Sequence, residues 1–116
     1  MKPVMKRPMP YESHDAASNA QAAVLWAERE FATTNLIHGR DEKGGGYSII
    51  VRTSDDLLPT ANHLLMVTLL DEFLSDRAAS EIALLLDNWQ IGQAMREAGR
   101  SRRVVVTTHG LRVEPW

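Results

Sequence analysis

A short pattern near the C-terminus constrains the fold of this chain more than any other segment. Residues 102–108 include three consecutive valines, the dipeptide His109-Gly110 follows, and residues 111–115 again contain strand-forming side chains. Glycine as the second residue of a two-residue turn is typical of a type I′ β-hairpin. We therefore predict an antiparallel hairpin centred on this dipeptide.

Side chains alternate between the two faces of a strand, so the predicted register also assigns faces. It pairs Thr107 with Arg112, Val106 with Val113, Val105 with Glu114 and Arg103 with Trp116. One face then carries Val104, Val106, Leu111 and Val113. The other face carries Arg103, Thr107, Arg112 and Trp116. We expect the apolar face to contact the core, because burying an unpaired arginine is costly.

Hydrophobic periodicity predicts a helix near the start of the chain. Over residues 15–36 apolar side chains recur every three or four positions, with Ser13 or Asp15 available as the N-cap. Four glycines make residues 39–46 a predicted loop. Residues 47–52 are β-branched or aromatic in the main and are predicted to form a strand.

Two further helical segments are predicted between this strand and the hairpin. Residues 55–74 begin with acidic and proline start signals and continue into an almost wholly apolar stretch, which favours a central helix. Residues 77–98 also have helical periodicity and end at Gly99, in the usual place for a helix-terminating glycine. This segment is either one long helix or two short ones that break near Asp87.

One domain is the predicted organisation. A chain of 116 residues with 44% hydrophobic side chains is large enough to bury a single core. Three prolines among the first ten residues predict that residues 1–13 form a flexible basic arm and residues 14–116 the domain. The predicted fold class is α+β, with helices packed on a small antiparallel sheet and a C-terminal β-hairpin.

The absence of cysteine excludes several kinds of site. Disulfides, thiolate zinc sites and thiol nucleophiles all require a residue that this chain lacks. The apolar run at residues 64–67, like every other uninterrupted apolar run in the sequence, is far shorter than a membrane-spanning helix. The charged N-terminus is not followed by the apolar stretch of a secretory signal, so we expect a cytoplasmic protein.

Charge is distributed unevenly along the chain. The formal net charge is −2, but residues 54–87 contain seven carboxylates and one arginine, whereas residues 88–116 contain five arginines and two glutamates. Arginine is suited to phosphate and base-edge contacts because its planar guanidinium donates several hydrogen bonds. The C-terminal third is therefore the segment with the greatest potential for an anionic partner.

Sequence patterns for catalysis or metal binding are missing. The four histidines are scattered, Gly44-Gly45-Gly46 lacks the following residues of a phosphate-binding loop, and no serine lies in a nucleophile elbow. The carboxylate pairs stand where helix ends and solvated helix faces favour negative charge. We therefore expect no enzyme, no metal site and no cofactor.

Residues 78–116 resemble a winged helix-turn-helix DNA-binding domain, closest to the compact type of phage and mobile-element regulators. The stretch Ser80-Glu81-Ile82-Ala83 matches the first motif helix, Ile91-Gly92-Gln93-Ala94-Met95-Arg96 matches the recognition helix, and the hairpin matches the wing. The resemblance implies a transcription regulator that binds double-stranded DNA, usually as a homodimer.

The resemblance also implies roles for individual side chains. The recognition helix presents Gln90, Gln93, Arg96 and Arg100, and the wing presents Arg103, Thr107, His109 and Arg112. Gln90, Gln93 and Arg96 would read base edges, while Arg100, Arg102, Arg103 and Arg112 would neutralise phosphates. Lys2, Lys6 and Arg7 of the arm would reach the minor groove.

A protein-interaction or inhibitor module is the alternative prediction. The alanine-rich segment 15–36, with Trp26 and Phe31, offers a surface for a second copy or for a different protein. The acidic segment 54–87 offers another surface, which could imitate nucleic acid. No membrane partner is expected.

Overall fold

The computed structural model describes residues 15–54, 62–99 and 102–115. In these ranges the chain forms four helices and a five-stranded sheet, so it is an α+β protein. The elements are α1 (Ala16–Glu30), β1 (Leu36–Asp41), β2 (Gly46–Ser54), β3 (Asn62–Leu70), α2 (Asp71–Ser75), α3 (Ala79–Asn88), α4 (Ile91–Ala98), β4 (Arg102–Thr107) and β5 (Gly110–Pro115). The predicted arm, residues 1–13, lies outside the described residues.

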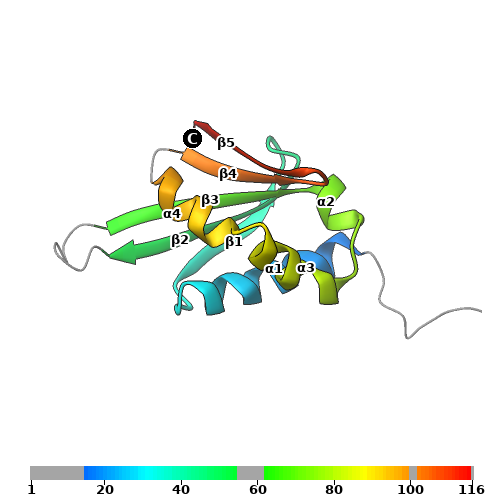
Figure 1. Cartoon of the computed structure of the whole chain (residues 1–116), viewed down its shortest axis with the longest axis horizontal. Coiled ribbons are helices and arrows are strands. Elements are labelled where there is room, and N and C mark those ends of the chain that lie inside the picture. Colours follow the sequence, from blue (N-terminus) through cyan, green and yellow to red (C-terminus); the bar gives the residue numbers. More distant parts are fainter. Residues whose placement is uncertain (1–14, 55–61, 100–101, 116) are drawn as a thin grey trace, which may run out of the picture.

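The strands lie in the sheet in their order along the chain, from β1 to β5. Neighbouring strands are antiparallel except β3 and β4, which are parallel. The prediction of an antiparallel sheet is therefore wrong at this one pair. The physical reason is the connection: α2, α3 and α4 carry the chain from the end of β3 back across the sheet, so β4 starts at the same end as β3 (Figure 1).

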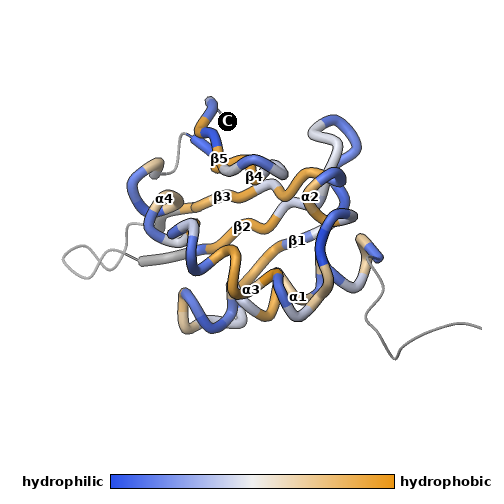
Figure 2. The backbone as a smooth tube through the Cα atoms, turned by 45° about the vertical axis from the view of Figure 1, so that its right-hand side comes forward, coloured by the Kyte–Doolittle hydropathy of each residue, from blue (hydrophilic) through white to orange (hydrophobic). Residues whose placement is uncertain are grey.

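The core lies between the sheet and the helices. Alternate strand residues, such as Ile49, Val67 and Val104, are fully buried against Trp26, Phe73 and other helix residues. Figure 2 shows apolar strands behind helices whose outer turns are hydrophilic. The opposite face of the sheet has no helix among the described elements, so the sheet has a helix-covered face and an open face.

The helix predicted over residues 55–74 is wrong. Residues 62–70 form β3, and only residues 71–75 are helical, as α2; residues 55–61 lie outside the described residues. β3 is the middle strand of the sheet, and its residues from Leu65 to Leu69 are buried on both faces. A strand buried on both sides reads as a continuous apolar run, which periodicity cannot distinguish from a buried helix.

The first helix begins as predicted and ends earlier. The side chain of Asp15 accepts a hydrogen bond from the Ala17 N–H at 3.2 Å, which confirms Asp15 as the N-cap. The helix stops at Glu30, and Ala32 adopts a left-handed φ of 49°. Leu36 therefore begins β1, which extends into the predicted loop as far as Asp41.

The segment between β3 and β4 contains two separate helices, α3 and α4. The chain breaks at Trp89 and Gln90, where Gln90 has φ 55° and ψ 43°. A left-handed residue cannot continue a right-handed helix, so α4 starts in a new direction. Gly99 ends α4 as predicted, with its N–H bonded to the carbonyl of Met95 at 3.1 Å.

The predicted hairpin exists, but its register is different. The turn is Thr108-His109, Thr107 pairs with Gly110, and Arg103 pairs with Glu114. The predicted register is thus wrong by one residue in the position of the turn. The face assignment survives. Each β4 residue now pairs with a β5 residue two positions from the predicted one, and residues two apart on a strand lie on the same face. Val104 and Val106 still share the helix-covered face with Leu111 and Val113, although the last two are exposed.

Candidate interaction surfaces

A groove lies where the end of α1 meets the junction between α3 and α4. The side chain of Asn19 donates to the carbonyls of Leu74 and Arg77, just before α3, and Trp26 Nε1 donates to Asp87 near the end of α3 at 2.8 Å. The two helices therefore run in the same direction. Their C-terminal ends lie together, and α4 begins beside them.

Glu30 and Arg96 join α1 to α4 at this groove. Arg96 donates to the Glu30 carboxylate at 2.7 Å and to its carbonyl at 3.1 Å. The guanidinium also lies over the Phe31 ring, 4.5 Å from its centroid. Gly92 is next to the same carboxylate, and a Cβ at this position would overlap the Glu30 side chain. Glycine is thus what allows Glu30 to pack against the first turn of α4.

Two adjacent cavities lie beside this junction. One is about 290 Å³ and is lined by Glu30, Leu86, Asp87, Gln90, Gly92, Gln93 and Arg96. The other is about 170 Å³ and is lined by Trp26, Arg29, Glu30 and Asp87. They share Glu30 and Asp87, so we treat them as one groove, the α1–α3–α4 groove. Its polar groups include hydrogen-bond donors and acceptors of both charges.

Two exposed leucines flank this groove. Leu25 on α1 is 50% exposed and lies one turn before Arg29; Leu84 on α3 is 60% exposed and lies one turn before Asp87. Residues three or four apart share a helix face, so each leucine lies on the face of its helix that carries a groove residue. The groove and the two leucines together form what we call the helical surface.

Three predicted DNA contacts lie at the groove. Gln90 is the left-handed residue between the helices, the Gln93 side chain donates to Glu97 at 2.9 Å, and Arg96 is bound to Glu30. The helix predicted for recognition therefore contributes residues to the groove. Two carboxylates accompany these residues and were not predicted: Asp87, which is close in the sequence, and Glu30, which is 66 positions from Arg96.

The predicted wing residue Arg103 lies on the open face of the sheet, inside a network of its own. Its guanidinium donates to Glu114 at 2.6 Å, and to Asp41 and the Thr68 hydroxyl at 3.3 Å. Only 21% of its side chain is exposed. The Arg103 hydrogen bond, followed by that of Arg112, lowers the pKa of Glu114. The hydrogen bond from the Gly44 N–H is the main cause of the lowered pKa of Asp41.

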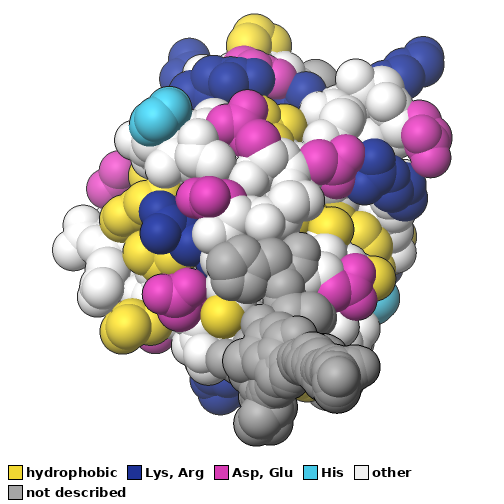
Figure 3. All heavy atoms as spheres, turned by 90° about the vertical axis from the view of Figure 1, so that its right-hand side faces the viewer, with side chains coloured by type: hydrophobic (Ala, Val, Ile, Leu, Met, Phe, Trp, Pro, Cys, Tyr) yellow, Lys and Arg dark blue, Asp and Glu magenta, His cyan; other side chains and the backbone are white. Residues whose placement is uncertain are grey.

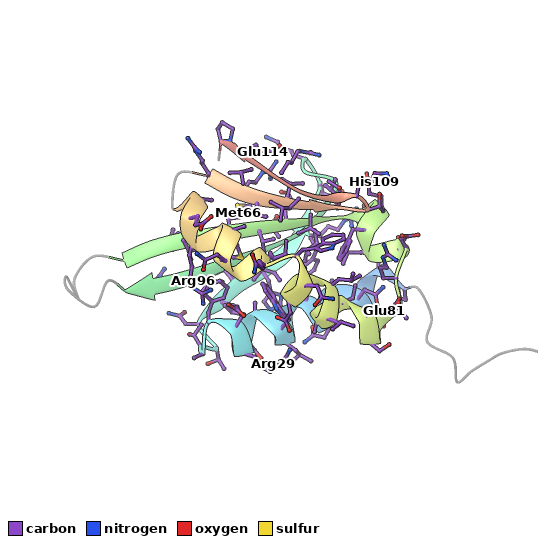
Figure 4. All side chains as sticks on the ribbon, in the orientation of Figure 1. Arg29, Met66, Glu81, Arg96, His109 and Glu114 are labelled. Carbon is purple, nitrogen blue, oxygen red and sulfur yellow. The ribbon has the colours of Figure 1, made fainter. Side chains whose placement is uncertain are left out.

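The other predicted wing residues are dispersed. Arg112 donates to Glu114 at 3.1 Å, the Thr107 hydroxyl donates to the Gly110 carbonyl, and Arg102 and His109 are exposed. Arg100 lies outside the described residues, as do Lys2, Lys6, Arg7 and Trp116. Arg96 and His109 lie toward opposite ends of the molecule (Figure 4). The tip of the hairpin is held instead at α2, where Thr108 donates to Glu72 at 2.8 Å.

Charge is mixed on the surface near the hairpin tip. Figure 3 views the end of the molecule where α1 begins, and acidic and basic side chains alternate across it. Within the described ranges there is no group of three or more His, Asp or Glu residues placed to hold a metal ion. In the same part of the chain, no helix is long and apolar enough to cross a membrane.

The surface predicted for a homodimer is occupied within the chain itself. Ala20, Ala23, Trp26 and Ala27 of α1 are buried in the core, and the Trp26 ring meets Phe31 edge to face at 6.4 Å between centroids. The alanine face of α1 packs on α3 and the sheet. It is therefore not free to bind a second copy.

Comparisons with protein-family models, curated proteins and solved structures found no match to this chain.

Proposed function

We propose that this protein is a binding module for another protein, which it engages through the helical surface. The observation that carries the proposal is the pair of exposed leucines, Leu25 and Leu84, beside a groove of mixed polarity. Protein-binding sites combine apolar side chains that the partner buries with polar groups that donate and accept hydrogen bonds. A partner would bury the leucines and place polar groups of its own in the groove.

The groove suits a short peptide segment better than a phosphate backbone. Glu30 and Asp87 face the same space as Arg29 and Arg96, so its formal charges cancel. Main-chain amides and carbonyls of a peptide match such a set of donors and acceptors, whereas repeated phosphates would be repelled by the two carboxylates. Leu86 lines the floor of the groove but is fully buried, so the apolar contacts of a peptide would come from Leu25 and Leu84.

A random-peptide library displayed on phage tests the proposal. Peptides enriched on the wild-type protein should bind Leu84→Glu and Leu25→Glu at least tenfold more weakly, since each variant replaces an exposed apolar side chain beside the groove with a charge. Glutamate keeps the helix propensity of leucine, so both variants should retain their circular dichroism spectra.

The matched control is Ile37→Glu. Ile37 is an exposed aliphatic residue of β1, 59% accessible, and it lies outside the helical surface. Affinity for the enriched peptides should not change in this variant. Failure to enrich any peptide, or an equal loss in all three variants, would contradict the assignment of the site.

Sequence-specific DNA binding, with a winged-helix arrangement of α3, α4 and the hairpin, is a second candidate. One observation favours it: α3 and α4 are separate helices and the hairpin follows directly. In this proposal Gln93 and Arg96 approach base edges and Arg102 contacts a phosphate. It ranks second because Arg96 and Arg103 already bind carboxylates of this chain.

Mobility shifts with a pool of random duplexes at low salt test this second candidate. If it holds, the affinity falls steeply with salt, Gln93→Ala changes the preferred sequences, and Arg102→Ala lowers the salt slope by about one. A pool that yields no shifted complex at low salt contradicts DNA binding and leaves the peptide proposal intact.

A further inference from the structure

Strand β5 is an edge of the sheet. It pairs with β4 on one side, and the described residues place no strand on the other. It is also well exposed: Leu111 is 38% and Val113 42% accessible, although both lie on the helix-covered face. Figure 1 shows β5 as the outermost strand, with α4 lying under β3 and β4. An exposed edge of this kind is a template for pairing with another strand.

The hairpin determines which backbone groups of β5 point outward. Thr107 and Gly110 flank the two-residue turn, so they form a hydrogen-bonded pair, and every second residue after Gly110 also bonds to β4. The N–H and C=O groups of Leu111 and Val113 therefore point away from the sheet. The carbonyl of Pro115 does so too, and proline has no N–H to leave unsatisfied there.

The side chains of β5 are complementary to those of an antiparallel copy of the same strand. A two-fold axis through Val113 places Val113 opposite Val113 of the second copy and Leu111 opposite Pro115. The same register places Arg112 directly opposite Glu114, twice, on the open face. Every pair except the central pair of valines occurs twice, because the contact is symmetric.

We propose that two copies of this chain pair antiparallel through β5 about a two-fold axis at Val113, which joins their sheets into one. The two valines exchange two main-chain hydrogen bonds, and each Leu111 N–H donates to the Pro115 carbonyl of the other copy. Arg112 and Glu114 form non-hydrogen-bonded pairs, in which facing side chains are closest. Opposite charges in such pairs stabilise a sheet.

Charge placement within one chain supports this pairing. One oxygen of Glu114 is bound by Arg103, and the other accepts from Arg112 of its own strand at 3.1 Å. Arg112 is 56% exposed, so it can rotate to Glu114 of the second copy. Each Glu114 would then lie between Arg103 of its own chain and Arg112 of the other.

The other edge of the sheet, β1, lacks these properties. Gly39 lies in the middle of β1 and weakens it as a pairing strand. Its opposite charges, Arg40 and Asp41, are adjacent and so face opposite sides of the sheet. No two-fold register can therefore place Arg40 opposite Asp41. Arg40 also forms a bidentate ion pair with Asp71 of its own chain, so it is not available to a second copy.

Single-cysteine variants test the proposal, because the chain has no cysteine of its own. Val113→Cys should form a disulfide-linked dimer under mild oxidation, since facing residues of a hydrogen-bonded pair are about 5.5 Å apart at Cα, within disulfide range. Leu111→Cys is the matched control. In this register the two copies of residue 111 are about 14 Å apart, four residues along the strand, and should not cross-link.

Sedimentation velocity gives an independent readout without cysteine. The wild type should show a monomer–dimer equilibrium, and Val113→Lys and Arg112→Glu should each raise its dissociation constant at least tenfold. Arg52→Glu, the same charge change at an exposed position of β2, should leave the equilibrium unchanged. Leu84→Glu should also leave it unchanged, which separates this interface from the peptide site. A wild type that is monomeric at all concentrations, or equal cross-linking of the two cysteine variants, would overturn the proposal.

Discussion

The guanidinium of Arg103 reaches the carboxylate of Asp41 across the open face of the sheet. The Nη1–Oδ2 distance is 3.3 Å, although Arg103 belongs to β4 and Asp41 to β1, with β2 and β3 between them. In a flat sheet these strands would be about 14 Å apart, three strand spacings. The contact requires the twist and coiling that are normal for sheets. Because Arg103 also binds Glu114 of β5, one side chain links both edge strands.

Loss of this arginine should destabilise the fold. Arg103→Met keeps most of the aliphatic stem but leaves Asp41 and Glu114 without their shared cation. Hydrogen bonds to charged, largely buried groups typically contribute about 1.5–3 kcal/mol, so we expect the free energy of unfolding to fall by about 2 kcal/mol in urea titrations. The control is Arg112→Ala: this side chain binds the same glutamate but is mostly exposed, and its loss should change stability by less than about 0.5 kcal/mol. Equal effects of the two variants would mean that the network does not stabilise the sheet.

Stability should depend on pH through the same carboxylates. The pKa values of Asp41 and Glu114 are lowered in the folded protein, below their ordinary values of 3.8 and 4.5. A group with a depressed folded pKa stabilises the fold above its unfolded pKa and loses that contribution as the pH falls through the folded value. The free energy of unfolding should thus be flat above about pH 6 and decline below about pH 4.5. In Arg103→Met the decline should be shallower, and an unchanged slope would contradict this origin.

Gly92→Ala should change stability in opposite directions in two backgrounds. In the wild type the added Cβ meets the Glu30 side chain, with Cδ at 2.7 Å and Cγ at 2.8 Å, so the Glu30–Arg96 pair must move and we expect destabilisation. In Glu30→Ala the space is free, and alanine should stabilise α4 by about 0.5–1 kcal/mol relative to glycine. A double-mutant cycle by chemical unfolding measures this. The same sign in both backgrounds would show that the overlap with Glu30 is not what keeps glycine at this position.

Asn19 should be among the most sensitive positions in α1. Its buried side-chain amide donates to the carbonyls of Leu74 at 2.6 Å and Arg77 at 2.5 Å, which attaches α1 to α2 and to the segment that leads into α3. Asn19→Ala leaves these carbonyls without a donor and should cost about 2 kcal/mol of unfolding free energy. Asn19→Asp should cost more at neutral pH, since a carboxylate only accepts, and the difference should shrink in acid. Gln21→Ala, at an exposed position of the same helix, is the control and should change little.

Local signals were sufficient for the elements whose ends are marked by particular residues. Asp15 caps α1, Gly99 ends α4, and the three valines of β4 form a strand beside β5, as their local chemistry predicts. The turn of this hairpin was misplaced because Gly110, with φ 132°, follows the turn and does not occupy its second position. A glycine near a turn thus predicts that a hairpin exists more reliably than it predicts its register.

The candidate surfaces depend on contacts between residues far apart in the chain. Gln93 and Arg96 can be found from helical spacing, but Glu30 is 66 positions from Arg96 and no local pattern connects them. Leu25 and Leu84 are also hard to predict. Each lies on the side of its helix opposite the buried residues, but only the packed structure shows that no other described element covers that side.

The sequence by itself determined the α+β class, the absence of disulfides, the capped first helix and the C-terminal hairpin, because each follows from residues within one segment or from composition. Tertiary structure alone decided that residues 62–70 form the middle strand. Their apolar run is compatible with either a buried helix or a strand buried on both faces. The segment is a strand because it forms backbone hydrogen bonds with β2 and β4. It also decided the role of Arg103: a basic side chain on a hairpin is free to bind phosphate only if folding brings no carboxylate to it, and here folding brings two.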